Sequence, residues 1–349
     1  MLFSLDVLLI LLNVYFFYKK KRSIIVDIVT GVYIWIVISG YYEGIDIYAY
    51  ISDYYRLMYT GESQFDGDIG FYLFQYWFTL QGYSYIVFKQ FIVFVAVYFM
   101  MNGIRKISTN VHLIYAYYLS YQLVLDTIQF RNFIGFAFFM FAIRYLIEEG
   151  KYNKFKYLFL ISIATCFHSI MILYSLFVFK DNKYIVSTVF YFSIILALIT
   201  LLNGFQIPLV QEFFSLGHAG DYLSGSATSS FAFLLPIITI ISYYIIVRKI
   251  QKNNPDNKLI ATVVNMDKIV MFSLPLCISS FQWYRLIRNM NIFHYAVISG
   301  NNRKDVLISI WLLFLLAFWI YCDWIRFVTI EGVMTVFENN VYINDISTI

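Results

Sequence analysis

Charged side chains are scarce in this sequence. They make up 13% of its 349 residues, whereas hydrophobic residues make up 61%. A soluble domain carries roughly 25% charged residues, so this composition excludes an ordinary soluble protein. No long polar stretch separates the apolar runs, and no internal repeat is visible. We therefore expect one transmembrane domain over residues 1–349.

The chain also lacks the patterns that mark several common kinds of site. Its three cysteines stand apart in or beside apolar runs, so neither a disulfide framework nor a metal site is expected. Its four histidines show no zinc-ligand spacing. A phosphate-binding glycine loop and a nucleophile elbow are absent. The net charge of +4 lies in short clusters between apolar runs, which argues against a nucleic-acid partner. No cofactor is indicated.

Apolar runs predict roughly 10–12 transmembrane helices, because a spanning helix needs about 20 apolar residues. The fold class is therefore an all-α, polytopic integral membrane protein. The first run is followed, not preceded, by basic residues, so we expect a retained helix instead of a cleaved signal peptide. The predicted helices are 2–18, 23–41, 84–104, 111–125, 132–147, 157–179, 184–202, 231–247, 263–281, 287–299 and 306–321.

Basic clusters indicate which ends of these helices face the cytoplasm. Lys19–Arg22, Arg105–Lys106 and Lys151–Lys156 are three such clusters. Outer loops near 42–83 and 203–230 follow from this orientation. We predict a multi-pass protein of the cytoplasmic membrane whose working face lies outside or in the periplasm.

Two apolar runs do not fit a simple up-and-down topology. Residues 69–81 are too short to span and must enter and leave on the outer side, which predicts a re-entrant or interfacial helix. Residues 157–179 lie between Lys156 and Lys180–Lys183, both cytoplasmic by charge. Either this run is a bent hairpin with His168 near its apex, or one of the two basic clusters lies outside.

The first outer segment mixes carboxylates with tyrosines. Asp46, Tyr50 and Asp53 stand at i, i+4 and i+7, which places them on one face of a helix. Carboxylates accept hydroxyl protons, and tyrosine rings present apolar faces that suit sugars. The alternative is a solvated face of an interfacial helix, where tyrosine is common. Asp66 and Asp68 flank a glycine, a pattern more typical of a turn than of a metal site.

Outer arginines are the second candidate feature. Gln129 and Arg131 stand at an outer helix start, and Arg285 and Arg288 stand at another outer edge. The planar guanidinium stays charged in a low dielectric and suits phosphate or pyrophosphate. The alternative for Arg131 is an internal ion pair with Asp126 or with an aspartate of the first outer loop.

His168 is the third candidate feature, within Phe167-His168-Ser169. A lone histidine in a helix is more often a packing residue than a catalyst. Its imidazole nevertheless titrates near neutrality, so it can shuttle protons where a carboxylate cannot.

The order of these features resembles the EpsG-like group of exopolysaccharide and O-antigen polymerases, the Wzy-type enzymes. Asp46 and Tyr50 match an Asp-x-x-x-Tyr element in the first outer loop. Asp68–Phe71 resembles an acidic-Gly-aromatic helix start, with Asp-Ile where Glu-Pro is usual. Ile128–Arg131 resembles the next helix start, although Gln is common at the position that follows. Phe167–Ser169 matches Phe-His-x-Ser/Ala, and the segment from Arg285 to Tyr295 resembles a late arginine-aromatic helix.

This resemblance covers roughly residues 40–300 and implies a polymerase of lipid-linked oligosaccharide repeat units. The implied fold resembles that of polyprenyl-donor (GT-C-like) glycosyltransferases. The implied partners are undecaprenyl-pyrophosphate-linked oligosaccharides, the lipid bilayer and a protein that regulates chain length. The product would be a capsule, an exopolysaccharide or an O-antigen, made at the outer face of the membrane.

The resemblance also suggests roles for the candidate residues. Arg131, Arg285 and Arg288 would bind pyrophosphate, where negative charge develops in the transition state. His168 or Asp46 would be the general base or its orienting partner. The remaining predicted substrate contacts, or supports for the arginines, are Asp53, Asp68, Gln129 and Tyr50.

Two other functions fit the sequence. A flippase of lipid-linked saccharides needs a path through the membrane and usually shows repeat symmetry, which is not visible here. A membrane-bound acyltransferase that modifies surface glycans would use a catalytic histidine, and His168 keeps this alternative open.

Overall fold

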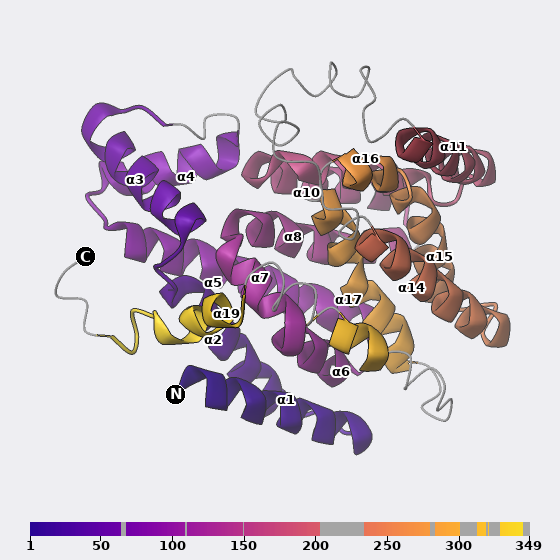
Figure 1. Cartoon of the computed structure of the whole chain (residues 1–349), viewed down its shortest axis with the longest axis horizontal. Helices are drawn as coiled ribbons and strands as arrows, with labels where there is room; N and C mark the ends of the chain where they lie inside the picture. The colour runs from indigo at the N-terminus through magenta and orange to yellow at the C-terminus, as the bar shows by residue number, and fades with distance from the viewer. Residues whose placement is uncertain are drawn as a thin grey trace. The chain divides into compact units, whose positions relative to one another are not determined.

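The computed structural model describes residues 1–63, 68–108, 110–148, 150–202, 234–279, 283–300, 313–318, 320 and 329–344. The regular structure of these residues is helical. Their β-type pairing is an isolated antiparallel bridge between Tyr41 and Asn340. The prediction of an all-α protein is confirmed for this part of the chain (Figure 1). Two compact units are present: unit 1 is Met1–Ser175 with Asn302–Ile349, and unit 2 is Leu176–Asn301.

The described part of unit 1 contains the α-helices α1 to α10 and, near the C-terminus, α19. The predicted helices 2–18, 23–41 and 84–104 are confirmed to within a few residues. A π-helical turn, η1, interrupts the predicted helix 111–125. The helices of unit 1 are α1 Leu2–Tyr18, α2 Ile24–Gly40, α3 Ile45–Thr60, α4 Ile69–Leu80, α5 Tyr85–Ile107, α6 Val111–Tyr117, η1 Tyr118–Gln122, α7 Leu123–Ile128, α8 Phe130–Ala142, α9 Arg144–Ile147, α10 Asn153–Phe167 and α19 Thr329–Glu338.

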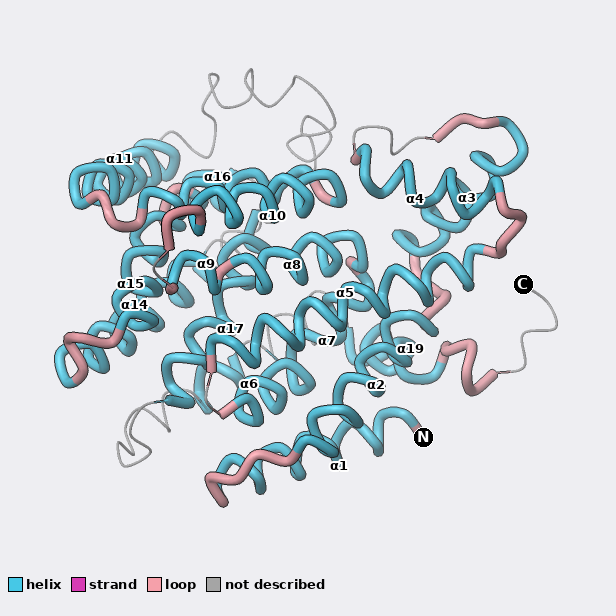
Figure 2. Tube along the Cα trace, turned by 180° about the vertical axis from the view of Figure 1, so that it is seen from behind, coloured by secondary structure: helices cyan, strands magenta, loops and turns pink. Residues whose placement is uncertain are grey.

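Helix α8 is the centre of unit 1. It packs against α5 on one side and α10 on the other (Figure 2). Glycines permit these close contacts: a Cβ atom on Gly103 of α5 would lie 2.5 Å from the Met140 carbonyl oxygen of α8. A Cβ atom on Gly135 would lie 2.8 Å from Met171 Cγ. Small residues at helix crossings are typical of packing inside membranes.

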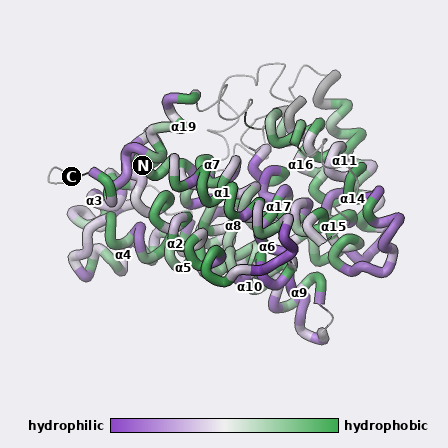
Figure 3. Tube along the Cα trace, turned by 90° about the horizontal axis from the view of Figure 1, so that it is seen from below, coloured by the Kyte–Doolittle hydropathy of each residue, from purple (hydrophilic) through white to green (hydrophobic). Residues whose placement is uncertain are grey.

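The surface of α5 indicates a membrane environment. Val87, Phe91, Phe94 and Tyr98 are each at least 40% exposed and form one stripe along the helix. The core helix of a soluble protein would bury such a stripe. Along the chain, apolar residues follow the helices and polar residues gather in connections (Figure 3).

Two helical stretches of the described chain, Tyr85–Ile107 and Phe130–Ile147, are long and apolar enough to span a bilayer. This agrees with a membrane protein. The predicted count of ten to twelve spanning helices, the GT-C-like fold and the orientation remain predictions.

The predicted outer loop 42–83 contains two helices, α3 and α4. Gly44 precedes α3 with φ of 101°, and Gly61 ends it with φ of 77°, backbone conformations that glycine adopts without strain. With 12 residues, α4 confirms a short helix within the predicted 69–81. It packs against α3 and α10.

The predicted helix 157–179 is broken at His168. Helix α10 ends at Phe167, His168 is extended with φ of −156° and ψ of 111°, and a 3₁₀-helix, η2, runs from Ser169 to Phe179. The Tyr157 hydroxyl donates to the Tyr174 carbonyl oxygen at 2.6 Å. In one straight α-helix these residues would be about 25 Å apart. The chain therefore folds back, as the bent-hairpin alternative predicts, and the side of the membrane on which each basic cluster lies stays a prediction.

The described part of unit 2 contains α11 and four later helices. A turn at Met271 and Phe272 divides the predicted helix 263–281, so its prediction as one helix is wrong. Pro275 explains the break, because its ring clashes with the carbonyl group four residues earlier. The helices of unit 2 are α11 Lys183–Leu202, α14 Leu234–Asn253, α15 Lys258–Val270, α16 Ser273–Ser279 and α17 Tyr284–Gly300.

The interior of unit 2 holds a buried contact between a histidine and an aspartate. His294 Nε2 lies 2.7 Å from Asp267 Oδ1, and both side chains are at most 1% exposed. The His294 ring stacks on Tyr243 at a centroid distance of 4.4 Å. The predicted outer loop 203–230 lies outside the described residues. The predicted last helix, 306–321, is described only at 313–318 and 320.

The Gly103→Ala variant tests the α5–α8 contact. Its methyl group would overlap the Met140 carbonyl oxygen, so we expect a loss of stability of about 1–3 kcal/mol. Thermal unfolding of the detergent-solubilised protein measures it. The control is Gly300→Ala, where a Cβ atom meets nothing within 4 Å. Equal melting temperatures for the two variants would contradict the close packing.

Candidate active site

Three segments that lie far apart in the sequence meet at the carboxylate of Asp68. Arg131 Nη1 lies 2.8 Å from Asp68 Oδ2 and donates a hydrogen bond to it. His168 Nδ1 lies 3.9 Å from the same oxygen, which is an ion-pair distance longer than a hydrogen bond. The three side chains are 10–12% exposed, so the cluster is largely but not completely covered.

The backbone around each residue explains this meeting. Asp68 directly precedes α4, Arg131 lies in the first turn of α8, and His168 occupies the break between α10 and η2. The break leaves the N–H group of Ser169 outside the α-helix, and it donates to Asp68 Oδ1 at 3.0 Å. Both carboxylate oxygens of Asp68 are therefore engaged.

Gly70 permits α4 to approach α10. A Cβ atom at this position would lie 2.8 Å from the Cβ atom of Cys166 and 3.0 Å from its carbonyl oxygen. Any larger residue would push the start of α4 away from the end of α10. The glycine of the acidic-Gly-aromatic element thus brings Asp68 within reach of His168.

The environment of Asp68 keeps its carboxylate ionised. Burial alone raises the pKa of Asp68, but the interaction with His168, the charge of Arg131 and the Ser169 N–H group outweigh it. The net effect lowers the pKa below its usual value. An ionised aspartate with both oxygens engaged suits an orienting role better than that of a base.

Aromatic rings surround the Arg131 guanidinium. Its Cζ atom lies 5.0 Å from the ring centroid of Tyr50 and 5.6 Å from that of Phe71. Tyr50 also packs edge-on against Phe130 at 4.8 Å. Such cation–π contacts stabilise a cation in a poorly hydrated place and restrict its orientation. Tyr50 is 6% exposed, so it supports Arg131 instead of presenting an open face.

The three residues of the predicted face of α3, Asp46, Tyr50 and Asp53, have different environments in the structure. Asp53 is 1% exposed, accepts from Arg56 Nη2 at 2.8 Å and from Ser63 Oγ at 2.7 Å, and so holds the end of α3 in place. Asp46 is exposed and makes no hydrogen bond or ion pair within the described chain. Of the predicted i, i+4, i+7 face, only Tyr50 reaches the Arg131 cluster.

The remaining candidates lie elsewhere. Gln129 is partly exposed at the junction of α7 and α8, two residues before Arg131. Arg285 and Arg288 are on α17 of unit 2, where Arg288 is 3% exposed. Their predicted joint action with Arg131 stays a prediction. Asp126, the other partner considered for Arg131, instead accepts from Tyr118 at 3.1 Å.

Sequence reasoning missed Lys89. This lysine on α5 is 1% exposed, and its Nζ atom donates to the carbonyl oxygen of Tyr41, which ends α2. It also lies 5.4 Å from the ring centroid of Phe130, next to Arg131. The sequence shows Lys89 as a single charged residue within the apolar run 84–104, which could have marked it as a buried polar group. A lysine amino group at a helix C-terminus satisfies carbonyl groups that have no partner within the helix.

Asp66, the neighbour of Asp68 in the Asp-Gly-Asp pair, lies outside the described residues. Within the described ranges, no group of three or more His, Cys, Asp or Glu side chains is placed to hold a metal ion. The arrangement can instead position a fixed cation and an imidazole at one carboxylate, which is suited to anion binding and proton transfer.

These features define a helical membrane protein with a covered ion-paired cluster. The chain belongs to the EpsG family, whose family model matches residues 24–338. This is a family of Wzy-like polymerases, and membership indicates a role in exopolysaccharide polymerisation. No curated protein and no solved structure matches the chain.

Asp68→Asn tests the electrostatic role of this residue. The pKa of Asp68 is lower in the folded than in the unfolded protein, where it is about 3.9. Its stabilising effect is therefore present above that unfolded value and is lost as pH falls through the folded pKa. We expect Asp68→Asn to cost about 2 kcal/mol at pH 7. The deficit should shrink below about pH 4.

Melting temperatures between pH 3 and pH 7 measure this dependence. Asp46→Asn removes the same charge from an exposed position in the first turn of α3 and should cost less than about 1 kcal/mol, the usual size of a helix-dipole contribution. If the stability lost in Asp68→Asn were the same at pH 3 as at pH 7, the effect would come from the altered side-chain packing and not from the lost charge.

Proposed function

We propose that this protein joins undecaprenyl-pyrophosphate-linked oligosaccharide repeat units into a surface polysaccharide at the outer face of the cytoplasmic membrane. It would act as a glycosyltransferase with a lipid-linked donor. Membership of the EpsG family supports this class of reaction. The observation that carries it is the Arg131–Asp68–His168 cluster, a phosphate-binding group and a proton acceptor held at one carboxylate.

The reaction needs one bond to form and one to break. A hydroxyl oxygen of the incoming unit attacks the anomeric carbon of the growing chain. The bond from that carbon to the pyrophosphate oxygen breaks, and undecaprenyl pyrophosphate leaves with the bonding electrons. The hydroxyl proton passes to a base. Negative charge thus develops on the pyrophosphate as positive charge develops at the sugar.

Arg131 is assigned to the leaving pyrophosphate. Its guanidinium carries five N–H donors in a plane, and Asp68 engages the group through Nη1. The Tyr50 and Phe71 rings fix its plane. A cation held in place before the reaction stabilises developing charge without a cost of reorganisation. Arg285 and Arg288 are proposed as further contacts to the lipid-linked substrates.

His168 is assigned as the general base, and Asp68 as the residue that orients it. An imidazole beside an ionised carboxylate is a stronger base, because the carboxylate stabilises the imidazolium that forms. The same carboxylate fixes Arg131, so the two groups keep a constant separation. Asp46 is a weaker candidate because no contact joins it to this cluster.

Glycan profiling of a deletion strain tests the function directly. Polymer is resolved by gel electrophoresis, and the polyprenyl-linked intermediates are extracted and sized. Loss of the long ladder with single repeat units on outer-leaflet lipid is expected. Units trapped in the inner leaflet would indicate a flippase, and a normal ladder that lacks an acyl group would indicate an acyltransferase.

Arg131→Lys and Arg131→Ala test the phosphate contact in the complemented strain. Lysine keeps the charge but lacks the planar fork, so both variants should reduce polymer formation by about 10²–10³-fold. The matched control is Arg56→Lys, which alters an arginine–aspartate pair at the end of α3 outside the cluster. Normal polymer from Arg131→Ala would remove this residue from the mechanism.

His168→Gln tests the proposed base. Glutamine has a similar size but accepts no proton at neutral pH, so the polymerisation rate should fall by about 10²–10⁴-fold while the protein remains folded. Cys166→Ala, two residues earlier at the end of α10, controls for local disturbance. Radiolabelled lipid-linked units and purified protein give the rate. An unchanged rate would make His168 a packing residue.

A further inference from the structure

A second ion-paired cluster lies in unit 1, away from the residues of the proposed active site. It lies where the turn between α1 and α2 meets the end of α5, and it combines many cations with one carboxylate. The carboxylate is that of Asp27, on α2. The basic residues of these two segments are Lys19, Lys20, Lys21, Arg22, Arg105 and Lys106.

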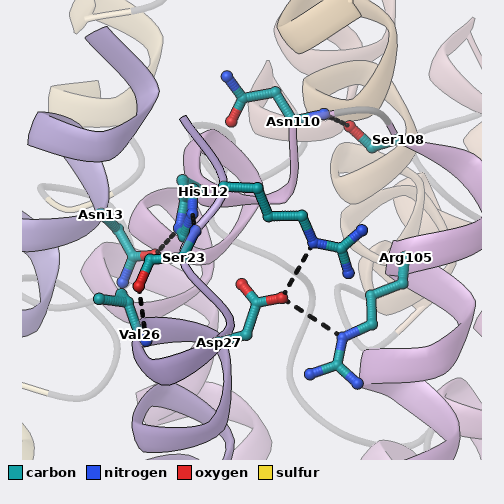
Figure 4. A network of polar contacts seen from close by, with 9 residues as sticks. Asn13, Ser23, Val26, Asp27, Arg105, Ser108, Asn110 and His112 are labelled. Atoms are coloured by element: carbon teal, nitrogen blue, oxygen red, sulfur yellow. Dashed lines mark hydrogen bonds and ion pairs between the residues drawn. The ribbon is translucent and has the colours of Figure 1, made fainter. Parts of the chain in front are cut away.

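Two arginines share a single oxygen of Asp27. Arg22 Nε lies 3.3 Å and Arg105 Nε 3.5 Å from Asp27 Oδ2. The Asp27 side chain is fully buried, whereas those of Arg22 and Arg105 are 49% and 29% exposed. Figure 4 shows Arg105 reaching Asp27 through Nε while its two Nη atoms point away from the carboxylate. Arg22 is the more open of the two arginines, whereas Arg105 also interacts with the buried Tyr115 side chain.

A hydrogen-bond network fixes this arrangement in advance. His112 Nε2 accepts from the Ser23 N–H group at 3.2 Å, so its proton is on Nδ1, which donates to Asn13 Oδ1 at 2.8 Å. Asn13 Nδ2 in turn donates to the Thr30 hydroxyl at 3.1 Å. These bonds tie α1, α2, α6 and the turn that carries Arg22 together (Figure 4). A ligand would meet arginines that are already in place, which reduces the entropy lost on binding.

The charge balance favours an anion as the missing partner. Two guanidinium groups repel each other, and one carboxylate neutralises only one of them. The exposed lysines of the turn add to the excess. The planar fork of arginine forms paired hydrogen bonds to phosphate oxygens, which a lysine cannot do.

The surrounding surface favours a lipid as the source of that phosphate. Next to Arg22, Tyr18 on α1 and Ile24 and Ile25 on α2 are each at least 67% exposed. Ile28, one helical turn further along α2, is 54% exposed. A free phosphate ion would gain nothing from this apolar surface. A phospholipid would place its acyl chains along it and its headgroup at the arginines.

We propose that Arg22 and Arg105, positioned by Asp27, bind the phosphate group of an anionic phospholipid. This assignment is independent of the proposed polymerase activity. Basic clusters beside the ends of membrane helices attract anionic headgroups. Here the shared buried carboxylate and the His112 network add a fixed geometry to that attraction.

Native mass spectrometry of the full-length protein tests the proposal. The protein is released from nanodiscs that contain phosphatidylglycerol and phosphatidylcholine in equal parts, and the retained lipids are identified. Arg22→Gln/Arg105→Gln should lower the preference for phosphatidylglycerol by about 30-fold, from roughly 1 kcal/mol for each lost cation. Arg22→Lys/Arg105→Lys should retain part of the preference, because it keeps the charge without the fork.

The matched control is Lys151→Gln/Lys154→Gln, which removes two exposed cations, one in the turn before α10 and one in its first turn. It should retain the full preference. If this control lost as much of the preference for phosphatidylglycerol, the lipid would be attracted to basic helix ends in general, and the proposal would be overturned. So would unchanged retention in Arg22→Gln/Arg105→Gln. Binding of inorganic phosphate by the detergent-solubilised protein, without selective retention of phosphatidylglycerol, would indicate a site for free anions instead.

The double variant leaves Asp27 as a buried, unpaired carboxylate and can fail to fold for that reason. Adding Asp27→Asn removes the stranded charge. The triple variant Arg22→Gln/Asp27→Asn/Arg105→Gln should fold, judged by its melting temperature, and should show the same loss of lipid preference. A folded triple variant that keeps the preference would overturn the proposal.

Discussion

The carboxylate of Asp68 is the constraint on which the proposed active site depends. One oxygen holds Arg131 and faces His168, and the other accepts the Ser169 N–H group. These contacts join the start of α4, the start of α8 and the break after α10. Removing the carboxylate would release a cation and an imidazole together. The two groups would then repel each other whenever the imidazole is protonated, so one acidic residue sets both geometry and charge.

The backbone makes this meeting of side chains possible. The α10 hairpin reverses at His168, and Gly135 lets α8 approach the hairpin closely. Gly70 does the same for α4 against Cys166. Close helix packing thus excludes most of the solvent from the cluster, and electrostatic interactions are stronger where water is scarce. The aromatic rings around Arg131 fill the space that water would otherwise occupy.

Both clusters use the same device, a buried aspartate that fixes an arginine, which the Asp53–Arg56 pair at the end of α3 also shows. Asp68 neutralises the charge of Arg131, and His168 lies beside the pair. The net charge of this cluster therefore changes by one when His168 gains or loses a proton. Asp27 contacts two arginines and leaves a permanent positive excess. The first arrangement suits a reaction in which charge moves. The second suits stable attachment to an anion, which is why the two clusters receive different proposed roles.

The amino-acid sequence was enough to predict the all-α fold, most helix positions and Arg131 and His168 as site candidates, because apolar runs and costly buried charges are local features. It also left open an ion pair between Arg131 and an aspartate of the first outer loop. The folded structure was needed to show that Asp68 is this partner, that Asp53 binds Arg56 instead, and that the chain reverses at His168. Pro275 marks where the predicted helix 263–281 is divided. The apolar pattern of that segment continues across the break, so hydropathy alone predicted one helix. Partners of buried charges are set by which helices touch, and such contacts between distant segments leave no periodic signal in the sequence.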